Sequence, residues 1–144
     1  MMTKNQKNED IVGWFYEQAG KQYDIDLDNT AEFHLRATLV LEEANELYRE
    51  VADILISGRT HDKVHNMIKE IGDVLYTIYG FAGSLGIDPQ VVFNRIANSN
   101  FSKLEGGVTK DAAGKVMKGP KYQPPDLTDL ADELMDRQIE KRLT

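Results

Sequence analysis

Two long segments of this chain repeat apolar residues with the 3.6-residue period of an α-helix. In residues 30–56 one broad face is apolar, with Phe33, Val40, Leu47 and Val51 among its members. Residues 60–85 carry a second and wider apolar arc. No segment alternates apolar and polar residues over the length of a strand. The sequence therefore predicts an all-α protein, an antiparallel four-helix bundle with short connections.

Further helices are predicted over residues 8–23, 89–102 and 128–142. Asn29 followed by Glu32 is typical of a capping box, and Asp88-Pro89 is typical of a helix start. Glycine and proline punctuate residues 103–126, which predicts an ordered loop or a short hairpin. We expect one domain over residues 1–127 and a helical extension over residues 128–144.

Acidic residues form two pairs, Glu43-x-x-Glu46 and Glu70-x-x-Asp73, one on each long helix. Residues three apart share a helix face, with Cβ atoms about 5–6 Å apart. Two such helices packed together direct four carboxylates at one point, where their charges repel unless a cation joins them. Hard cations such as Mg²⁺ and Mn²⁺ prefer oxygen ligands and phosphate-bearing substrates. The pairs predict a metal-dependent enzyme that acts on phosphates.

The alternative is that these carboxylates are merely solvated, as most isolated Glu-x-x-Glu pairs on helices are. In that case the chain is a non-catalytic helical interaction protein. Two features favour a site. Glu70 borders the apolar arc of its helix, and Leu35 and Leu39 fall on the acidic face of the preceding helix, where a purely solvated face would not favour them.

Composition narrows the classes of function. The chain has no cysteine, which excludes a thiolate nucleophile and a cysteine zinc site. Its net charge of −7 disfavours binding to a nucleic-acid polymer. No apolar run reaches the roughly 18 residues of a membrane span, and the polar start is unlike a signal peptide. We expect a soluble cytoplasmic protein without a membrane partner.

The charge is distributed unevenly. Residues 102–122 contain five lysines against Glu105 and Asp111, a net charge of +3, so the rest of the chain carries −10. Lysine ammonium groups and backbone amides in an ordered loop can hold phosphate oxygens. An acidic body with one basic loop suits a small anionic ligand, held by a metal on one side and by lysines on the other.

Specific motifs give the chain a family resemblance. EEANE, followed 23 residues later by EIGD, resembles the signature of the MazG-like all-α nucleoside triphosphate pyrophosphohydrolases. The segment FHLRATLVLEEANELYREV is similar to the second helix of that family. The segments SNFSKL and KGPKYQPPDL are similar to the ending of its short branch, which is related to phosphoribosyl-ATP pyrophosphohydrolase. The resemblance covers roughly residues 10–127.

The resemblance implies a MazG-like bundle, assembled as a homodimer or homotetramer, that converts a (d)NTP and water to a (d)NMP and pyrophosphate in nucleotide-pool housekeeping. Phosphoribosyl-ATP hydrolysis is the alternative within the family. Bound Mg²⁺ or Mn²⁺ ions would neutralise the phosphate charge and lower the pKa of a water molecule for in-line attack on the α-phosphorus. The metal ligands would be Glu43, Glu46, Glu70 and Asp73. The catalytic residues would be Glu43 and Glu42, with Glu42 as an outer ligand or base. The substrate would be bound by Asn100, Lys103, Lys115, Lys118 and Tyr122.

Overall fold

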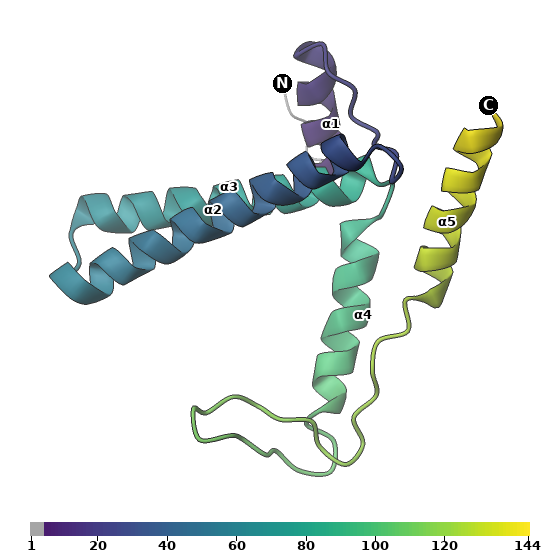
Figure 1. Cartoon of the computed structure of the whole chain (residues 1–144). Helices are drawn as coiled ribbons and strands as arrows, with labels where there is room; N and C mark the ends of the chain where they lie inside the picture. The colour runs from purple at the N-terminus through teal and green to yellow at the C-terminus, as the bar shows by residue number, and fades with distance from the viewer. Residues whose placement is uncertain (1–4) are drawn as a thin grey trace.

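The computed structural model describes residues 5–144 as five helices (Figure 1). These residues contain no strand, and Lys110 and Val116 form an isolated antiparallel bridge. The all-α prediction is confirmed. The helices are α1 (Asn8–Gln18), α2 (Thr30–Ser57), α3 (His61–Ser84), α4 (Pro89–Ser102) and α5 (Thr128–Leu143).

None of the described helices is both long enough and apolar enough to cross a membrane.

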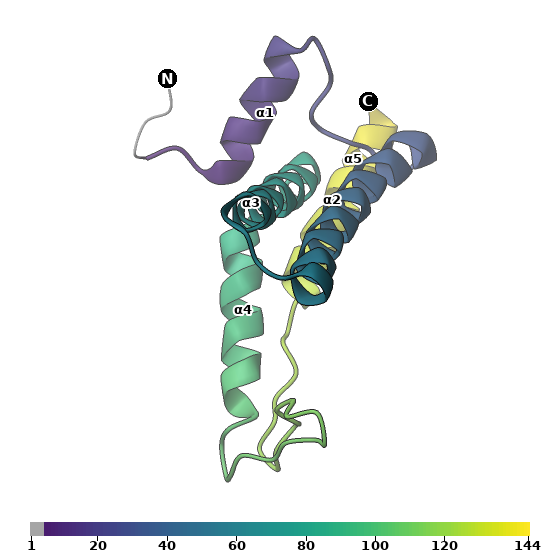
Figure 2. The same ribbon diagram turned by 90° about the vertical axis from the view of Figure 1, so that its left-hand side faces the viewer.

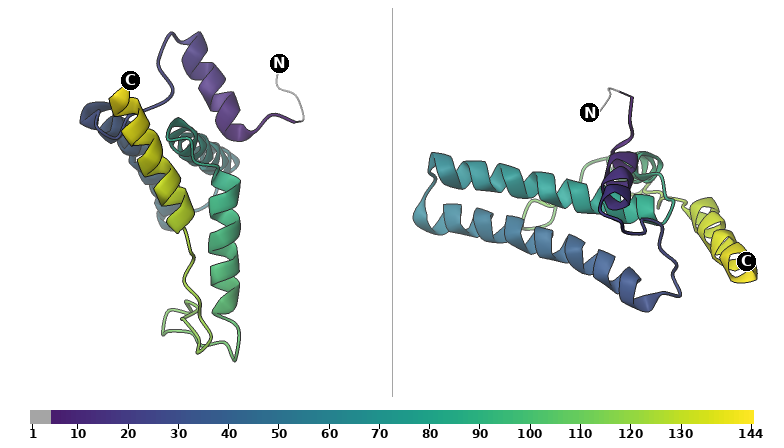
Figure 3. Two further views of the ribbon diagram at one scale, coloured as in Figure 1. Left: turned by 90° about the vertical axis from the view of Figure 1, so that its right-hand side faces the viewer. Right: turned by 90° about the horizontal axis from the view of Figure 1, so that it is seen from above.

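Helices α2 and α3 form a long antiparallel hairpin, seen side by side in Figure 3. The Asn29 side chain accepts a hydrogen bond from the backbone N–H of Glu32 at 3.3 Å, as the predicted N-cap requires. The helix ends at Ser57 and is followed by Gly58, whose φ of 85° suits a residue without Cβ. Thr60 then caps α3 through the backbone N–H of Lys63. Both helices follow their predicted ranges to within a residue, because local capping chemistry sets their ends.

Helix α1 crosses α3 and is shorter than predicted. It ends at Gln18 rather than near Tyr23, because Gly20 takes a φ of 68° and turns the chain. Tyr23 then folds back and donates a hydrogen bond to the carbonyl of Glu9 at 2.8 Å. A Cβ at Gly13 would lie 2.8 Å from the Tyr23 ring, so this mid-helix glycine permits the close packing.

Helix α4 leaves the end of α3 and projects away from the α2–α3 hairpin (Figures 1 and 2). Asp88 caps it through the backbone N–H of Gln90 at 2.9 Å, as predicted. The single chain therefore shows a helical hairpin with α1 across it and α4 pointing outward, and the antiparallel four-helix arrangement is not confirmed within one chain.

The segment between α4 and α5 is an ordered loop at the far end of α4. Ser99 donates a hydrogen bond to the carbonyl of Gln123 at 2.7 Å, and Ser102 accepts one from the Gln123 backbone N–H at 2.8 Å. These bonds fix the returning segment of the loop, at Gln123, to the last turn of α4. The Lys110–Val116 bridge gives the loop the character of a short hairpin.

Helix α5 runs back and binds the connector between α1 and α2. The buried Gln138 side chain accepts a hydrogen bond from the backbone N–H of Leu27 at 2.9 Å. Arg142 makes a bidentate pair with Asp28, with nitrogen–oxygen distances of 2.6 and 2.9 Å. Lys141 donates to the Ile25 carbonyl at 3.3 Å. The C-terminal helix thus holds a segment more than a hundred residues away in the sequence.

The chain buries little of its apolar surface. Among residues 5–144 the buried apolar side chains are Val12, Ile25 and Leu85. Many large apolar side chains remain exposed along α2, α3 and α4, including Leu55, Ile68, Ile71, Leu75, Ile78 and Phe93. An apolar face of this length is unusual for a protein that works as a monomer.

Candidate active site

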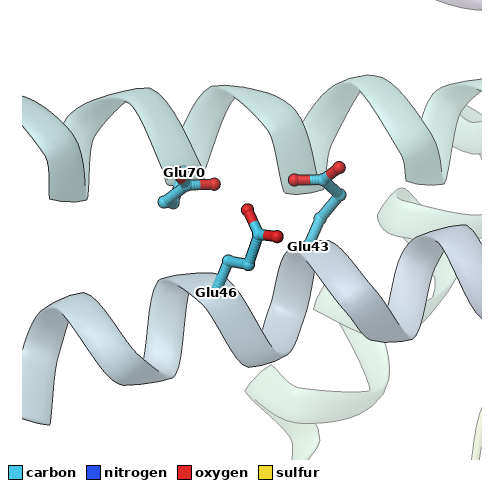
Figure 4. Close-up of side chains that lie close together, drawn as sticks. All are labelled: Glu43, Glu46 and Glu70. Atoms are coloured by element: carbon cyan, nitrogen blue, oxygen red, sulfur yellow. The ribbon is translucent and has the colours of Figure 1, made fainter.

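Three of the four predicted metal ligands face one another across the α2–α3 hairpin (Figure 4). Glu43 and Glu46 lie one turn apart on α2, and Glu70 projects from α3. Each contributes one carboxylate oxygen, and these oxygens lie within 4.8 Å of one another. The antiparallel hairpin brings three of the four predicted carboxylates together, and Asp73 lies outside this group.

The electrostatics of this group are unfavourable without a cation. Glu70 is only 6% exposed. Partial burial raises the pKa of Glu43, and repulsion from Asp73, Glu46 and Glu70 raises it further. The Oε2 atoms of Glu43 and Glu70 are buried and receive no hydrogen bond from any described residue. Carboxylate oxygens that converge on one point, some of them without a hydrogen-bond donor, suit a hard divalent cation such as Mg²⁺ or Mn²⁺.

Asp73 lies beside this group but bonds to a lysine. Its carboxylate accepts a hydrogen bond from the Lys69 ammonium at 2.6 Å, and the same ammonium lies 3.0 Å from Glu70. The bond to Asp73, followed by that to Glu70, raises the pKa of Lys69. The ammonium therefore neutralises one side of the cluster. Sequence reasoning missed Lys69, although its i, i+4 spacing from Asp73 is a known pairing signal.

Glu42, the predicted outer ligand or base, is exposed on α2 and lies outside the group of three. Successive residues on a helix are about 100° apart, so Glu42 and Glu43 cannot face the same point equally.

The predicted substrate-binding residues lie elsewhere in the chain. Asn100 is exposed on the last turn of α4, and Lys103 follows it, half-buried. In the loop, the Lys118 ammonium lies 4.8 Å from the centre of the Tyr122 ring, a cation–π contact. Lys115 is exposed. In Figures 1 and 2 this loop is at the far end of α4, away from the hairpin that carries the carboxylates. One chain does not bring the two halves of the predicted site together.

Arg36 is a further residue near the site that sequence reasoning missed. It lies two turns before Glu43 on the same face of α2 and is only 3% exposed. Its Nε atom bonds to Glu32 at 2.8 Å, and the Tyr16 ring lies 4.1 Å from its guanidinium carbon. Seven-residue spacing from Glu43 is the one signal in the sequence that associates Arg36 with the acidic face.

The family model described as phosphoribosyl-ATP pyrophosphohydrolase matches residues 17–100, more than half of the chain. The matched region contains α2, α3, most of α4 and all four acidic residues of the two pairs. The comparison with curated proteins gave no match. Members of the family are pyrophosphohydrolases that in general depend on metal ions, which agrees with the acidic cluster. The chain belongs to the phosphoribosyl-ATP pyrophosphohydrolase family, within the MazG-like all-α nucleoside triphosphate pyrophosphohydrolase superfamily.

Proposed function

We propose that this protein hydrolyses nucleoside triphosphates between the α and β phosphates and releases a nucleoside monophosphate and pyrophosphate. The observation that carries the proposal is the group formed by Glu43, Glu46 and Glu70 in a chain that belongs to a pyrophosphohydrolase family. One buried oxygen of Glu43 and one of Glu70 receive no hydrogen bond from any described residue. A surface of merely solvated carboxylates would not bury Glu70 beside two other glutamates.

In this proposal Glu43, Glu46 and Glu70 hold Mg²⁺ or Mn²⁺, and Asp73 joins them when Lys69 releases it. A bound divalent ion supplies charge neutralisation on the phosphates and lowers the pKa of a water. Glu42 acts as an outer ligand or as the base that accepts a proton. Lys103, Lys115 and Lys118 bind phosphate oxygens, while Asn100 and Tyr122 contact the nucleotide.

A second copy of the chain completes the site in this proposal. The apolar face of α3 and α4 is exposed, with a hollow of about 690 Å³ lined by Leu75, Ile78, Leu85, Val92 and Phe93 among others. Burying such surface stabilises by about 25 cal/mol per Å². Two hairpins packed face to face would form an antiparallel four-helix bundle and bring the basic loop of one copy toward the carboxylates of the other. A closed dimer is the commonest such assembly, followed by a dimer of dimers.

This assembly predicts a particle of at least twice the 16.3 kDa chain mass at micromolar concentration, measured by light scattering. We expect this because none of residues 5–144 covers the exposed apolar face of α3 and α4 in a single chain. A monomeric mass in a fully active sample would contradict it, and the whole site would then lie within one chain.

The function itself is tested with all eight (d)NTPs and with phosphoribosyl-ATP, each with Mg²⁺ or Mn²⁺, by measuring pyrophosphate release. We expect at least one triphosphate to yield one pyrophosphate per monophosphate, and chelation of the metal to stop the reaction. Turnover of phosphoribosyl-ATP alone would support the second candidate, which the family match favours. Absence of turnover, together with no Mn²⁺ binding by calorimetry, would indicate a non-catalytic interaction protein.

A further inference from the structure

Two adjoining hollows begin about one helical turn from the carboxylates, toward the N-terminal end of α2. The larger, about 700 Å³, is enclosed by the end of α1, the connector and the first half of α2. The smaller, about 200 Å³, lies between α1, α2 and α3 and includes Thr77 and Phe81. Tyr16, Arg36 and Leu39 line both, so these side chains separate the two spaces.

The position of these hollows matches the far end of a nucleotide. Leu39 lies one turn before Glu43 on α2, and Thr77 lies one turn after Asp73 on α3. Arg36 is seven residues from Glu43, about 10 Å along the helix axis. With its phosphates at the carboxylates, a nucleotide oriented toward the start of α2 would place its base in these hollows.

Arg36 has unused hydrogen-bonding capacity at this place. Its Nε atom donates to Glu32 and its Nη2 atom donates to the carbonyl of Gln22, both at 2.8 Å. Its Nη1 atom is buried and has no hydrogen-bond partner among the described residues. A buried donor on a charged group is costly to leave unpaired, so such atoms usually have a partner that is protein, water or ligand.

We propose that these hollows form the nucleobase pocket and that Arg36, through Nη1, determines specificity by donating a hydrogen bond to a carbonyl oxygen of the base. This inference rests on the function proposed above and names its substrate class. A guanidinium group has donors only, so it needs an acceptor. Uracil, thymine, cytosine and guanine present carbonyl oxygens, and adenine presents none. Since Nη1 is covered, a side chain must move aside, and the Tyr16 ring on the guanidinium face is the one we expect to move.

The charge of the larger hollow distinguishes between the two candidate substrates, a nucleoside triphosphate and phosphoribosyl-ATP. Lys21 and Arg36 face three carboxylates there, Asp24, Asp26 and Glu32, which leaves a net charge of −1. A neutral base fits this lining. Phosphoribosyl-ATP carries an additional phosphorylated ribose on its adenine, and a hollow of this sign would repel that phosphate. The hollow therefore favours a nucleoside triphosphate with a carbonyl-bearing base.

The test is Arg36→Lys, which keeps the positive charge and removes the Nη1 donor. We expect kcat/KM for the preferred triphosphate to fall about 10- to 100-fold, the effect of losing a charge-assisted hydrogen bond. The same variant should hydrolyse a deoxyribose triphosphate without a base as well as the unmodified enzyme does. Arg59→Lys, an exposed change at the α2–α3 turn, is the matched control and should alter neither value.

The assignment of Arg36 would be overturned if Arg36→Lys lowered kcat/KM equally for the preferred triphosphate and for the triphosphate without a base. It would also be overturned if kcat/KM fell for neither. A second measurement does not depend on how the variant folds. In the unmodified enzyme ATP should be at least about 10-fold poorer than the best triphosphate with a carbonyl-bearing base. If ATP is the best substrate, the pocket does not select bases by a carbonyl oxygen, and the proposal is wrong.

Binding of nucleosides without metal distinguishes failure of this inference from failure of the proposed function. Titration with uridine, cytidine and guanosine, followed by NMR signals of the Tyr16 ring, reports on the pocket alone. Nucleoside-induced shifts that Arg36→Lys abolishes would support the pocket even if no triphosphate were hydrolysed. Hydrolysis of triphosphates without such shifts would overturn the pocket and leave the proposed function standing.

Discussion

Replacing Glu46 with alanine is expected to lower pyrophosphate release by more than about 100-fold while the chain stays folded. Groups that only support metal ligands cost 10- to 100-fold when removed, so loss of a direct ligand should exceed that range. The fold should survive because Glu46 is exposed and its removal relieves repulsion with Glu43 and Glu70. Thermal unfolding of the metal-free variant should therefore occur at or above the temperature of the parent.

Asp73→Ala is expected to have the same effect on turnover, because it removes a fourth carboxylate from the cluster. Glu50→Ala is the matched control: it removes a glutamate one turn beyond Glu46 that lies outside the group of three. Steady-state rates at saturating Mg²⁺ and calorimetric titration with Mn²⁺ measure the outcome. A Glu46→Ala enzyme that keeps a near-full rate at saturating Mg²⁺ would show that the metal site is assigned to the wrong residues.

Replacing Lys118 with alanine should lower kcat/KM about 10- to 150-fold, because a charge-assisted hydrogen bond to a phosphate contributes about 1.5–3 kcal/mol. Lys110→Ala is the control, since it removes an exposed lysine side chain of the same loop and leaves the backbone bridge to Val116 possible. Measuring kcat and KM separately would show whether Lys118 acts on the bound triphosphate or on the transition state. An unchanged kcat/KM would leave the loop with a structural role only.

Mixing the Glu46→Ala and Lys118→Ala proteins would test whether one site uses residues of two chains. In a symmetric dimer with shared sites, each mixed dimer has one site with both defects and one with none. Random exchange of subunits would then restore about a quarter of the parental activity. If no activity returns after exchange is verified by mass spectrometry, the loop and the carboxylates of one site belong to one chain.

Sequence patterns were sufficient to predict the α2–α3 hairpin and to predict that carboxylates of its two helices lie close together. Helix ends depend on local chemistry, and the Asn29 and Thr60 caps lie where short-range hydrogen bonding places them. The i, i+3 spacing then determines which side chains share a face. Glu43, Glu46 and Glu70 could therefore be brought together before any tertiary contact was known.

Features that depend on packing between distant segments could not be predicted from the sequence. Helix α1 ends early because Gly20 turns the chain and Tyr23 returns to pack on Gly13, a contact without local signal. The distance of the basic loop from the carboxylates follows from the direction in which α4 leaves α3, which no periodicity encodes. Arg36 resembles an ordinary charged residue of α2 until the burial of its guanidinium is seen.

The contacts of α5 link the C-terminal helix to the connector beside the larger hollow, outside the carboxylate group. The family match ends at residue 100, yet Gln138, Lys141 and Arg142 hold residues 25–28 of the connector. That connector forms one wall of the larger hollow, through Ile25 and Asp26. Substitutions in the C-terminal helix can therefore reshape the larger hollow while every carboxylate of the α2–α3 hairpin stays in place. If the hollow binds the nucleobase as proposed, substitutions in α5 would alter substrate preference without touching the carboxylates.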